Sequence, residues 1–481
     1  MMTVNLEPVL PEIVLLCGAC VVLLGDLFLP DTKRHLSFWL TQVVLALAAW
    51  GTLASMQLQP ATAFSGMVVD DVLADTLKFF SCISVSLALF YSRDYCAARA
   101  LFRGETFVLT LFALIGMMVM IAAGSFVTLY LGLELLALAL YSMVAMYRTS
   151  NAASEAAMKY FVLGALASGI LLYGMSMIYG ATGSLDIAVV AKVLATGSGN
   201  KTILLFGLVF VVSGVAFKLG AVPYHMWVPD VYDGAPTAVT LLIGTAPKLA
   251  AYAFVLRLLG VALGSLWFDW QGMLLVLAVL SMVLGNVIAI AQTSIKRMLA
   301  YSAIANMGYM LMGFLAANPT GYSAAMFYAI AYVLTSLAAF GMIMLLSREG
   351  FEADRLDDFR GLNQRSPWWA FMMLLVMFSL AGVPPTVGFY AKFTVIQAAV
   401  DAGFVWLAVV AVMASLVGAF YYLRVVKLMY FDDATDTAPI AARGDSRALL
   451  SANGIALLLF GILPQPLLGL CVVALANSGL L

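Results

Sequence analysis

Charged residues are scarce in this sequence. Asp, Glu, Lys and Arg make up 10% of its 481 residues, and hydrophobic residues make up 64%. A soluble globular domain carries about 25% charged residues, so this composition excludes one and indicates a protein whose surface lies mainly in lipid. The formal net charge is -1, which provides no basic surface for a nucleic-acid partner.

Cysteine is also scarce, and its five copies are scattered through apolar segments. Cys17 and Cys20 form a CxxC pair, but no second pair accompanies it. We therefore interpret both as small buried apolar side chains rather than as a metal or redox site. Motifs for haem, flavin, nucleotide or iron–sulfur binding are lacking as well, so we expect this chain to bind no cofactor itself.

Long apolar runs, by contrast, recur along the whole chain. They are about 20 residues long, which is the length of a helix that spans the hydrocarbon core, whereas the strands of a membrane barrel would be short and alternating. The sequence therefore predicts an all-α polytopic membrane protein with about 14 transmembrane helices. We place them at residues 9–29, 36–58, 68–91, 105–123, 126–147, 155–180, 203–230, 236–260, 268–291, 298–316, 320–347, 368–401, 403–430 and 448–475.

The basic residues predict the orientation of these helices. If both termini lie on one side, the loops on that side contain two basic residues, Lys192 and Lys201. The loops on the other side contain fourteen: Lys33, Arg34, Arg93, Arg99, Arg103, Arg148, Lys296, Arg297, Arg348, Arg355, Arg360, Arg365, Arg443 and Arg447. Because loops rich in Lys and Arg remain in the cytoplasm, we expect both termini to lie outside it.

Two of the predicted helices contain proline in their interior, at Pro223 and at Pro384-Pro385, 161 residues apart. Proline breaks a helix, and lipid tolerates a break only where protein or a wet cavity satisfies the freed backbone groups. Broken helices at matching positions of two halves indicate a transporter built from inverted repeats. We divide the chain into a three-helix segment (1–104), a first repeat (105–260), a second repeat (261–430) and a C-terminal helix (431–481).

Several charged residues fall inside the apolar runs. Lys218, Lys248 and Lys392 have no nearby acid in sequence, and Glu134 has no charge within eight residues on either side. Because a charge at mid-membrane costs roughly 2.5 to 3.5 kcal/mol on insertion scales, such residues usually serve function. For Glu134 the structural alternative is a fixed ion pair between helices. His225, seven residues after Lys218, is either a proton relay or a buried core imidazole.

Three other charges have simpler interpretations. Lys159 follows Glu155 by four residues, so a structural ion pair is a fair alternative to a functional role. Lys78 follows Asp75 by three residues, and we interpret those two as a structural pair. Arg257 lies close to the end of its predicted helix, where it could reach the headgroups as an anchor.

Four segments resemble the antiporter-like membrane subunits of respiratory complex I, and the resemblance covers essentially the whole chain. They are YLGLELLALALYSMVA, FKLGAVPYHMWVPDVYDGAPTAVT, QTSIKRMLAYSAIANMGYM and LAGVPPTVGFYAKF. Within this group, the chain lacks the long lateral helix of one type, and it has Lys392 where another type has glutamate. The subunits of Mrp-type cation/proton antiporters share the same signature and remain an alternative.

The resemblance implies a proton-translocating subunit of NADH-quinone oxidoreductase in the bacterial inner membrane, with both termini in the periplasm. It implies that partner subunits hold NADH, FMN, iron–sulfur clusters and quinone, and that another antiporter-like subunit and small membrane subunits lie next to this chain. The residues that match the family's proton path are Glu134 (acid of the fifth span), Lys218 (lysine of the broken seventh), His225 (connecting histidine), Lys248 (central lysine of the eighth), Lys392 (terminal lysine of the broken twelfth) and Lys159.

Overall fold

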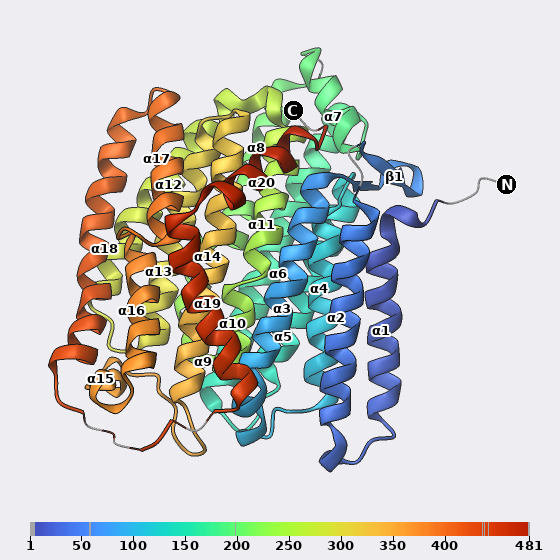
Figure 1. Cartoon of the computed structure of the whole chain (residues 1–481). Coiled ribbons are helices and arrows are strands. Elements are labelled where there is room, and N and C mark those ends of the chain that lie inside the picture. Colours follow the sequence, from blue (N-terminus) through green and yellow to red (C-terminus); the bar gives the residue numbers. More distant parts are fainter. Residues whose placement is uncertain are drawn as a thin grey trace.

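The chain folds into a bundle of helices that cross one slab side by side (Figure 1). The computed structural model describes residues 5–56, 59–197, 199–434, 436, 438–440 and 442–479. Within these residues, 13 helices are long and apolar enough to span a membrane. The predicted all-α membrane fold is therefore confirmed, and one short β-hairpin is added to it.

The first part of the chain contains α1 (Leu10–Asp26), α2 (His35–Ser55), the hairpin strands β1 (Ala61–Ala63) and β2 (Val68–Asp70), and α3 (Val72–Ala98). Next come α4 (Gly104–Ile121), α5 (Phe126–Ala145), α6 (Asn151–Thr182), α7 (Ile187–Ala195), α8 (Lys201–Leu219), α9 (Trp227–Gly234), α10 (Thr237–Gly244) and α11 (Pro247–Val255), which continues as a π-helical turn (Leu256–Ala262). The remainder contains α12 (Trp267–Ile290), α13 (Ile295–Leu315), α14 (Pro319–Leu346), α15 (Leu362–Arg365), α16 (Pro367–Ala381), α17 (Val387–Asp401), α18 (Val405–Phe431), α19 (Gly444–Ile462) and α20 (Gln465–Ala476).

Thirteen of the fourteen predicted apolar runs each overlap one of the candidate spans. The remaining run, residues 368–401, is divided into α16 and α17, each too short to cross alone. Together the two short helices make one further crossing. An even number of crossings agrees with Figure 1, where α1 begins and α20 ends at the same face as β1 and α7.

Both predicted breaks are present, and they are built alike. α8 ends at Gly220 (φ +76°) and α16 at Gly382 (φ +82°). Each glycine adopts the left-handed conformation that only glycine reaches without cost, which stops the helix. The prolines follow within three residues. Because α8 is the seventh crossing and α16–α17 the twelfth, the two broken helices run in opposite directions, as inverted repeats require.

Glycines bring neighbouring helices into close contact in both halves. A Cβ atom on Gly116 of α4 would lie 2.5 Å from the backbone nitrogen of Leu136 in α5. A Cβ on Gly285 of α12 would lie 2.8 Å from the backbone nitrogen of Ala305 in α13. Lipid tails are as apolar as Leu side chains, so close backbone packing of this kind is what holds membrane helices together.

The structure also corrects three expectations. Arg257 is not a headgroup anchor: it is buried and forms an ion pair of 2.8 Å with Asp71. Lys78 pairs with Glu12 (2.8 Å) of α1 rather than with Asp75 of its own helix. Cys17 and Cys20 are exposed on α1, not buried, because a lipid-facing position accepts small apolar residues as readily as a core does.

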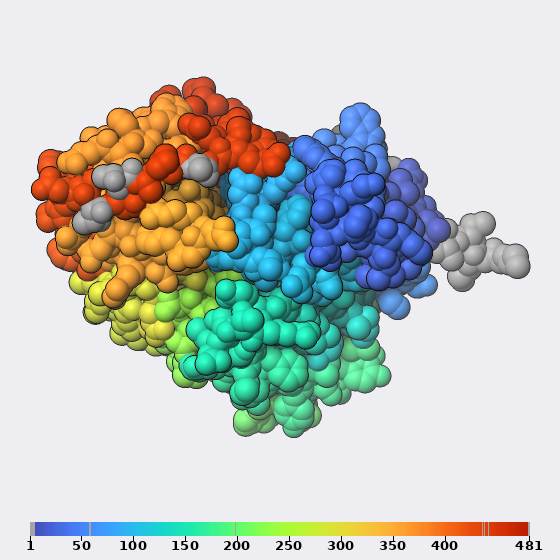
Figure 2. Space-filling view, turned by 90° about the horizontal axis from the view of Figure 1, so that it is seen from below, coloured from blue at the N-terminus to red at the C-terminus, as the bar shows by residue number. Residues whose placement is uncertain are grey.

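The face opposite the ends of the chain is held by ion pairs between loops. Asp436 contacts Arg348 (2.7 Å) and Arg365 (3.0 Å). The hydrogen bond from Arg348 lowers the pKa of the Asp436 carboxyl. Figure 2, a view of this face, shows the segment that follows α18 (red) lying across the region around α15 (orange).

The orientation in the membrane is testable on two exposed residues at opposite faces. We expect a cysteine in place of Glu349, beside the arginine-rich loops, to be protected from a membrane-impermeant maleimide in intact spheroplasts. A cysteine in place of Lys201, at the start of α8, should react. The unmodified chain supplies the background, and the reverse pattern of labelling would overturn the prediction.

Candidate functional site

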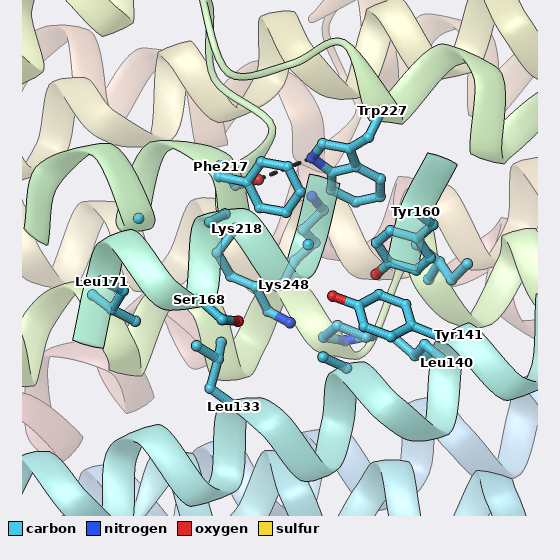
Figure 3. Close-up of a pocket in the computed structure, with 16 residues that line it drawn as sticks. Leu133, Leu140, Tyr141, Tyr160, Ser168, Leu171, Phe217, Lys218, Trp227 and Lys248 are labelled. Atoms are coloured by element: carbon cyan, nitrogen blue, oxygen red, sulfur yellow. Dashed lines mark hydrogen bonds between the residues drawn. The ribbon is translucent and has the colours of Figure 1, made fainter. Parts of the chain in front are cut away.

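A small cavity lies in the first half of the bundle, between α5, α6, α8 and α11. Its volume is about 30 Å³, enough for one or two water molecules. Figure 3 shows that Lys218 and Lys248 reach it from two different helices, while Tyr141, Tyr160 and Ser168 supply hydroxyl groups around it. The two lysines thus line the same cavity.

Lys218 is in the last turn of α8, directly before the break at Gly220. Its side chain is half-buried and lines the cavity. Among the described residues, no hydrogen-bond acceptor or carboxylate oxygen lies in direct contact with its ammonium group. The cavity therefore leaves this ammonium free to bind water or to change partner.

Lys248 occupies a third break, which the sequence analysis did not predict. α10 ends at Gly244, Thr245 is non-helical (φ -121°, ψ -101°), and α11 restarts at Pro247. Lys248 is 3% exposed, and its Nζ donates a hydrogen bond of 3.1 Å to the carbonyl oxygen of Leu219. That carbonyl belongs to the last residue of α8, at the negative end of the helix dipole.

Glu134 lies on α5 beside Leu133 and Ala137, two residues that line the cavity. Its Oε1 is buried without a hydrogen-bond partner. Within the described part of the chain, no cation lies within 4.0 Å of this carboxylate, so the fixed ion pair considered from the sequence is not formed. The charge of Glu134 attracts that of Lys218 from a distance, and the charges of Lys218 and Lys248 repel each other.

His225 and Lys159 are not among the residues that line this cavity. His225 lies in the turn between α8 and α9, and its Nδ1 is buried without a partner. Lys159 forms ion pairs of 2.8 Å with Glu155 and with Asp230 of α9, and Asp230 also contacts Arg297 of α13 (2.9 Å). The position of Lys159 thus agrees with the structural alternative, a link between α6, α9 and α13.

Lys392 lies in the second half, on α17, and is 8% exposed. Its Nζ donates to the carbonyl oxygens of Leu380 and Ala381 (both 2.9 Å) and to the Ser415 hydroxyl (3.1 Å). These carbonyls end α16, so Lys392 repeats the arrangement of Lys248 at the end of α8. A second, smaller cavity of about 10 Å³ adjoins it.

Asn306 and Tyr328, which the sequence analysis did not single out, line this second cavity, and a series of hydrogen bonds extends from them. Tyr328 donates to Asn306 (2.6 Å), Asn306 donates to Ser302 (3.2 Å), and Ser302 contacts the Tyr422 hydroxyl (2.5 Å). Asn306 could have indicated this group of residues from the sequence, because an amide inside an apolar helix needs a partner from another helix. Lys296, which the sequence analysis placed in a loop, is 4% exposed and donates to the Ala235 carbonyl oxygen (2.8 Å).

Comparison with known proteins shows which members of the resembling family this chain is similar to. A family model described as NADH:quinone oxidoreductase/Mrp antiporter, TM, matches residues 123–418. The chain is 60% identical over 471 residues to NADH-quinone oxidoreductase subunit N of Thiobacillus denitrificans, with 98% of each chain covered.

Solved structures agree. A chain of respiratory complex I from Thermus thermophilus with bound aureothin matches with a TM-score of 0.83 and 31% identity, over 98% of this chain and 100% of its own. A chain of the Mrp complex from Dietzia sp. DQ12-45-1b matches with a TM-score of 0.85 over 99% of this chain and 98% of its own. Its 22% identity shows a shared fold alone.

The full-length identity to subunit N decides between the complex I and Mrp alternatives that the sequence left open. It also agrees with the presence of Lys392 in the second broken helix. The chain belongs to the subunit N family of NADH-quinone oxidoreductases, as a proton-translocating, multi-pass membrane subunit of bacterial respiratory complex I.

Proposed function

We propose that protons pass through this subunit by way of Glu134, Lys218, Lys248 and Lys392, with water in the cavities between them. The observation that carries the proposal is the cavity shared by Lys218 and Lys248. One lysine there has no fixed partner, and the other is held by a helix-end carbonyl. A proton donor without a fixed contact is suited to transfer, because no hydrogen bond or ion pair has to be broken before the proton leaves.

The first transfer takes place in the first half of the chain. Glu134, when ionised, stabilises the ammonium form of Lys218 from a distance. When the charge of Glu134 is neutralised or drawn away, the Lys218 ammonium loses that support and gives its proton through cavity water to Lys248. The Leu219 carbonyl oxygen then accepts a hydrogen bond from the newly charged Lys248. His225, in the turn beside α8, is a candidate to connect this path to a second route.

In the second half, Lys392 is the corresponding acceptor. The amide and hydroxyl groups of Asn306, Tyr328 and Thr335 line the cavity next to it. Hydrogen-bonded chains of such groups transfer protons by exchanging donors and acceptors. We assign residues 105–260 and 261–430 to the two halves of this path, and residues 1–104 and 431–481 to the helices that flank it.

The energy for transfer comes from other subunits. Moving one charge across 100 mV costs about 2.3 kcal/mol, and each pK unit by which an acid–base pair is shifted supplies about 1.4 kcal/mol. We infer that partner subunits with NADH, FMN, iron–sulfur clusters and quinone provide this energy. Their conformational changes reach the chain through a neighbouring antiporter-like subunit and small membrane subunits.

Both termini are assigned to the periplasm, on the basis of the basic loops at the other face.

The pair Glu134 and Lys218 is tested by removing one charge at a time. Lys218→Met and Glu134→Gln should each lower proton pumping and NADH:quinone turnover roughly tenfold or more, the effect of losing about 1.4 kcal/mol. Glu134→Asp should be milder, because it keeps the charge. Pumping is measured in proteoliposomes and assembly by native gel. Wild-type pumping in an assembled Lys218→Met complex would remove Lys218 from the path.

Lys392 is tested by comparing two replacements. Lys392→Arg keeps the positive charge, but a guanidinium does not release its proton. A proton carrier at this position therefore predicts that Lys392→Arg and Lys392→Ala are both assembled and both slow. An active Lys392→Arg complex beside an unassembled Lys392→Ala complex would show that Lys392 is only a structural cation.

Gly382 offers a test that leaves Lys392 itself in place. Gly382→Ala adds a Cβ about 2.8 Å from Cδ of Lys392, so the lysine must move. Gly403→Ala is a matched control, because Gly403 also has positive φ (+90°) but faces open space. Both substitutions carry the left-handed backbone cost of about 1–2 kcal/mol. We expect turnover per assembled complex to fall for Gly382→Ala alone, and equal turnover in both would contradict the role of the lysine's position.

A further inference from the structure

A second group of buried charges lies apart from the lysine cavity, at the face where the chain begins and ends. It contains Glu12 of α1, Asp70 of β2, and Asp75 and Lys78 of α3. Asp70 is 7% exposed, Asp75 1% and Lys78 0%. None of these residues takes part in the proton path proposed above.

The charges of this group do not balance. Lys78 lies 2.8 Å from Glu12 and 3.6 Å from Asp70, so one ammonium serves two carboxylates. The neighbouring Asp71 and Arg257 form an ion pair of 2.8 Å and add no net charge. If all three acids were ionised, the buried group would carry a net charge of -2. Burial of uncompensated charge is costly enough that acids take up a proton instead.

The geometry shows where that proton belongs. The carboxyl groups of Asp70 and Asp75 face each other within hydrogen-bonding reach. Yet both oxygens of Asp75 and Oδ1 of Asp70 are buried without a donor among the described residues. Ionised carboxylates only accept hydrogen bonds, so two of them in contact repel unless one carries a proton and donates it to the other.

We propose that Asp70 and Asp75 form a proton-binding site, in which the two carboxyl groups share one proton beside the Lys78–Glu12 ion pair. The ligand of the site is the proton itself. Burial raises the pKa of the Asp70 carboxyl, although the Lys78 ammonium opposes this shift. The other charged groups that face the pair are Glu12 from α1, Asp71 from the start of α3, and Arg257 from the π-helical turn through Asp71.

The site is connected to the lysine cavity by a single helix. Arg257, which holds Asp71, follows Lys248 by nine residues on the continuous segment of α11 and its π-helical turn. Nine residues of helix extend roughly 13 Å. Figure 1 shows that α11 lies between α10 and the face that carries β1. The carboxyl pair therefore lies between Lys248 and the face of the termini, where a proton can be held before it crosses that face.

The test uses infrared spectroscopy on the resting, fully assembled complex, where no turnover is required. The wild-type spectrum at pH 7 should contain a protonated-carboxyl C=O band that disappears as the pH is raised. Asp75→Asn and Asp70→Asn should each abolish this band. Both should also assemble, since an amide can replace the donated hydrogen bond. Glu105→Gln removes an exposed acid and serves as the matched control, with the band unchanged.

Two results would overturn the proposal. One is a wild-type spectrum at pH 7 that contains no protonated-carboxyl band. The other is a band that survives in both variants. Because the measurement does not depend on pumping, its outcome is separate from that of the path through Lys218 and Lys248. If the Asn variants do not assemble, Asp75→Glu provides the alternative: it keeps the acid, and the proposal requires the band to remain at a shifted frequency.

Discussion

The arrangement of this subunit depends on hydrogen bonds between buried ammonium groups and the carbonyl oxygens at the ends of broken helices. A helix that stops inside a membrane leaves carbonyl groups without partners, and lipid cannot satisfy them. Lys248 donates to the last residue of α8, and Lys392 donates to the last two residues of α16. Each ammonium in turn is stabilised by the negative end of the helix dipole. The break and the buried charge therefore stabilise each other.

This mutual dependence explains how a lysine in the membrane can carry a proton without a carboxylate beside it. Carbonyl groups stabilise an ammonium but do not neutralise it, so the lysine keeps its proton less firmly than it would in an ion pair. Lys78 and Arg257 show the contrasting case, since each contacts a carboxylate at 2.8 Å. Carbonyl groups thus hold the two buried lysines beside the cavities, and carboxylates hold Lys78 and Arg257 near the face of the termini.

The sequence predicted the features that depend on residue type and local spacing. The apolar runs, both proline breaks and the isolated charges of Glu134, Lys218, Lys248 and Lys392 are visible without a structure. Partners from other helices are not, which is why Lys78 was assigned to Asp75 and Arg257 to the headgroups. The break before Lys248 was missed because Pro247 occupies the first turn of a new helix, where proline is also well tolerated. Apolar residues that face lipid and those that face protein look alike, so Cys17 and Cys20 were placed on the wrong side.

The size of the first cavity bears on which ions this chain can carry. Its volume of about 30 Å³ accepts one or two water molecules. A metal cation that travels with a shell of several waters would need a space several times larger, or a ring of oxygen ligands to replace the shell. A proton needs neither, since it passes along a single file of hydrogen bonds without displacing any atom heavier than hydrogen. The small volume of the cavity thus agrees with the proton-translocating activity of the family.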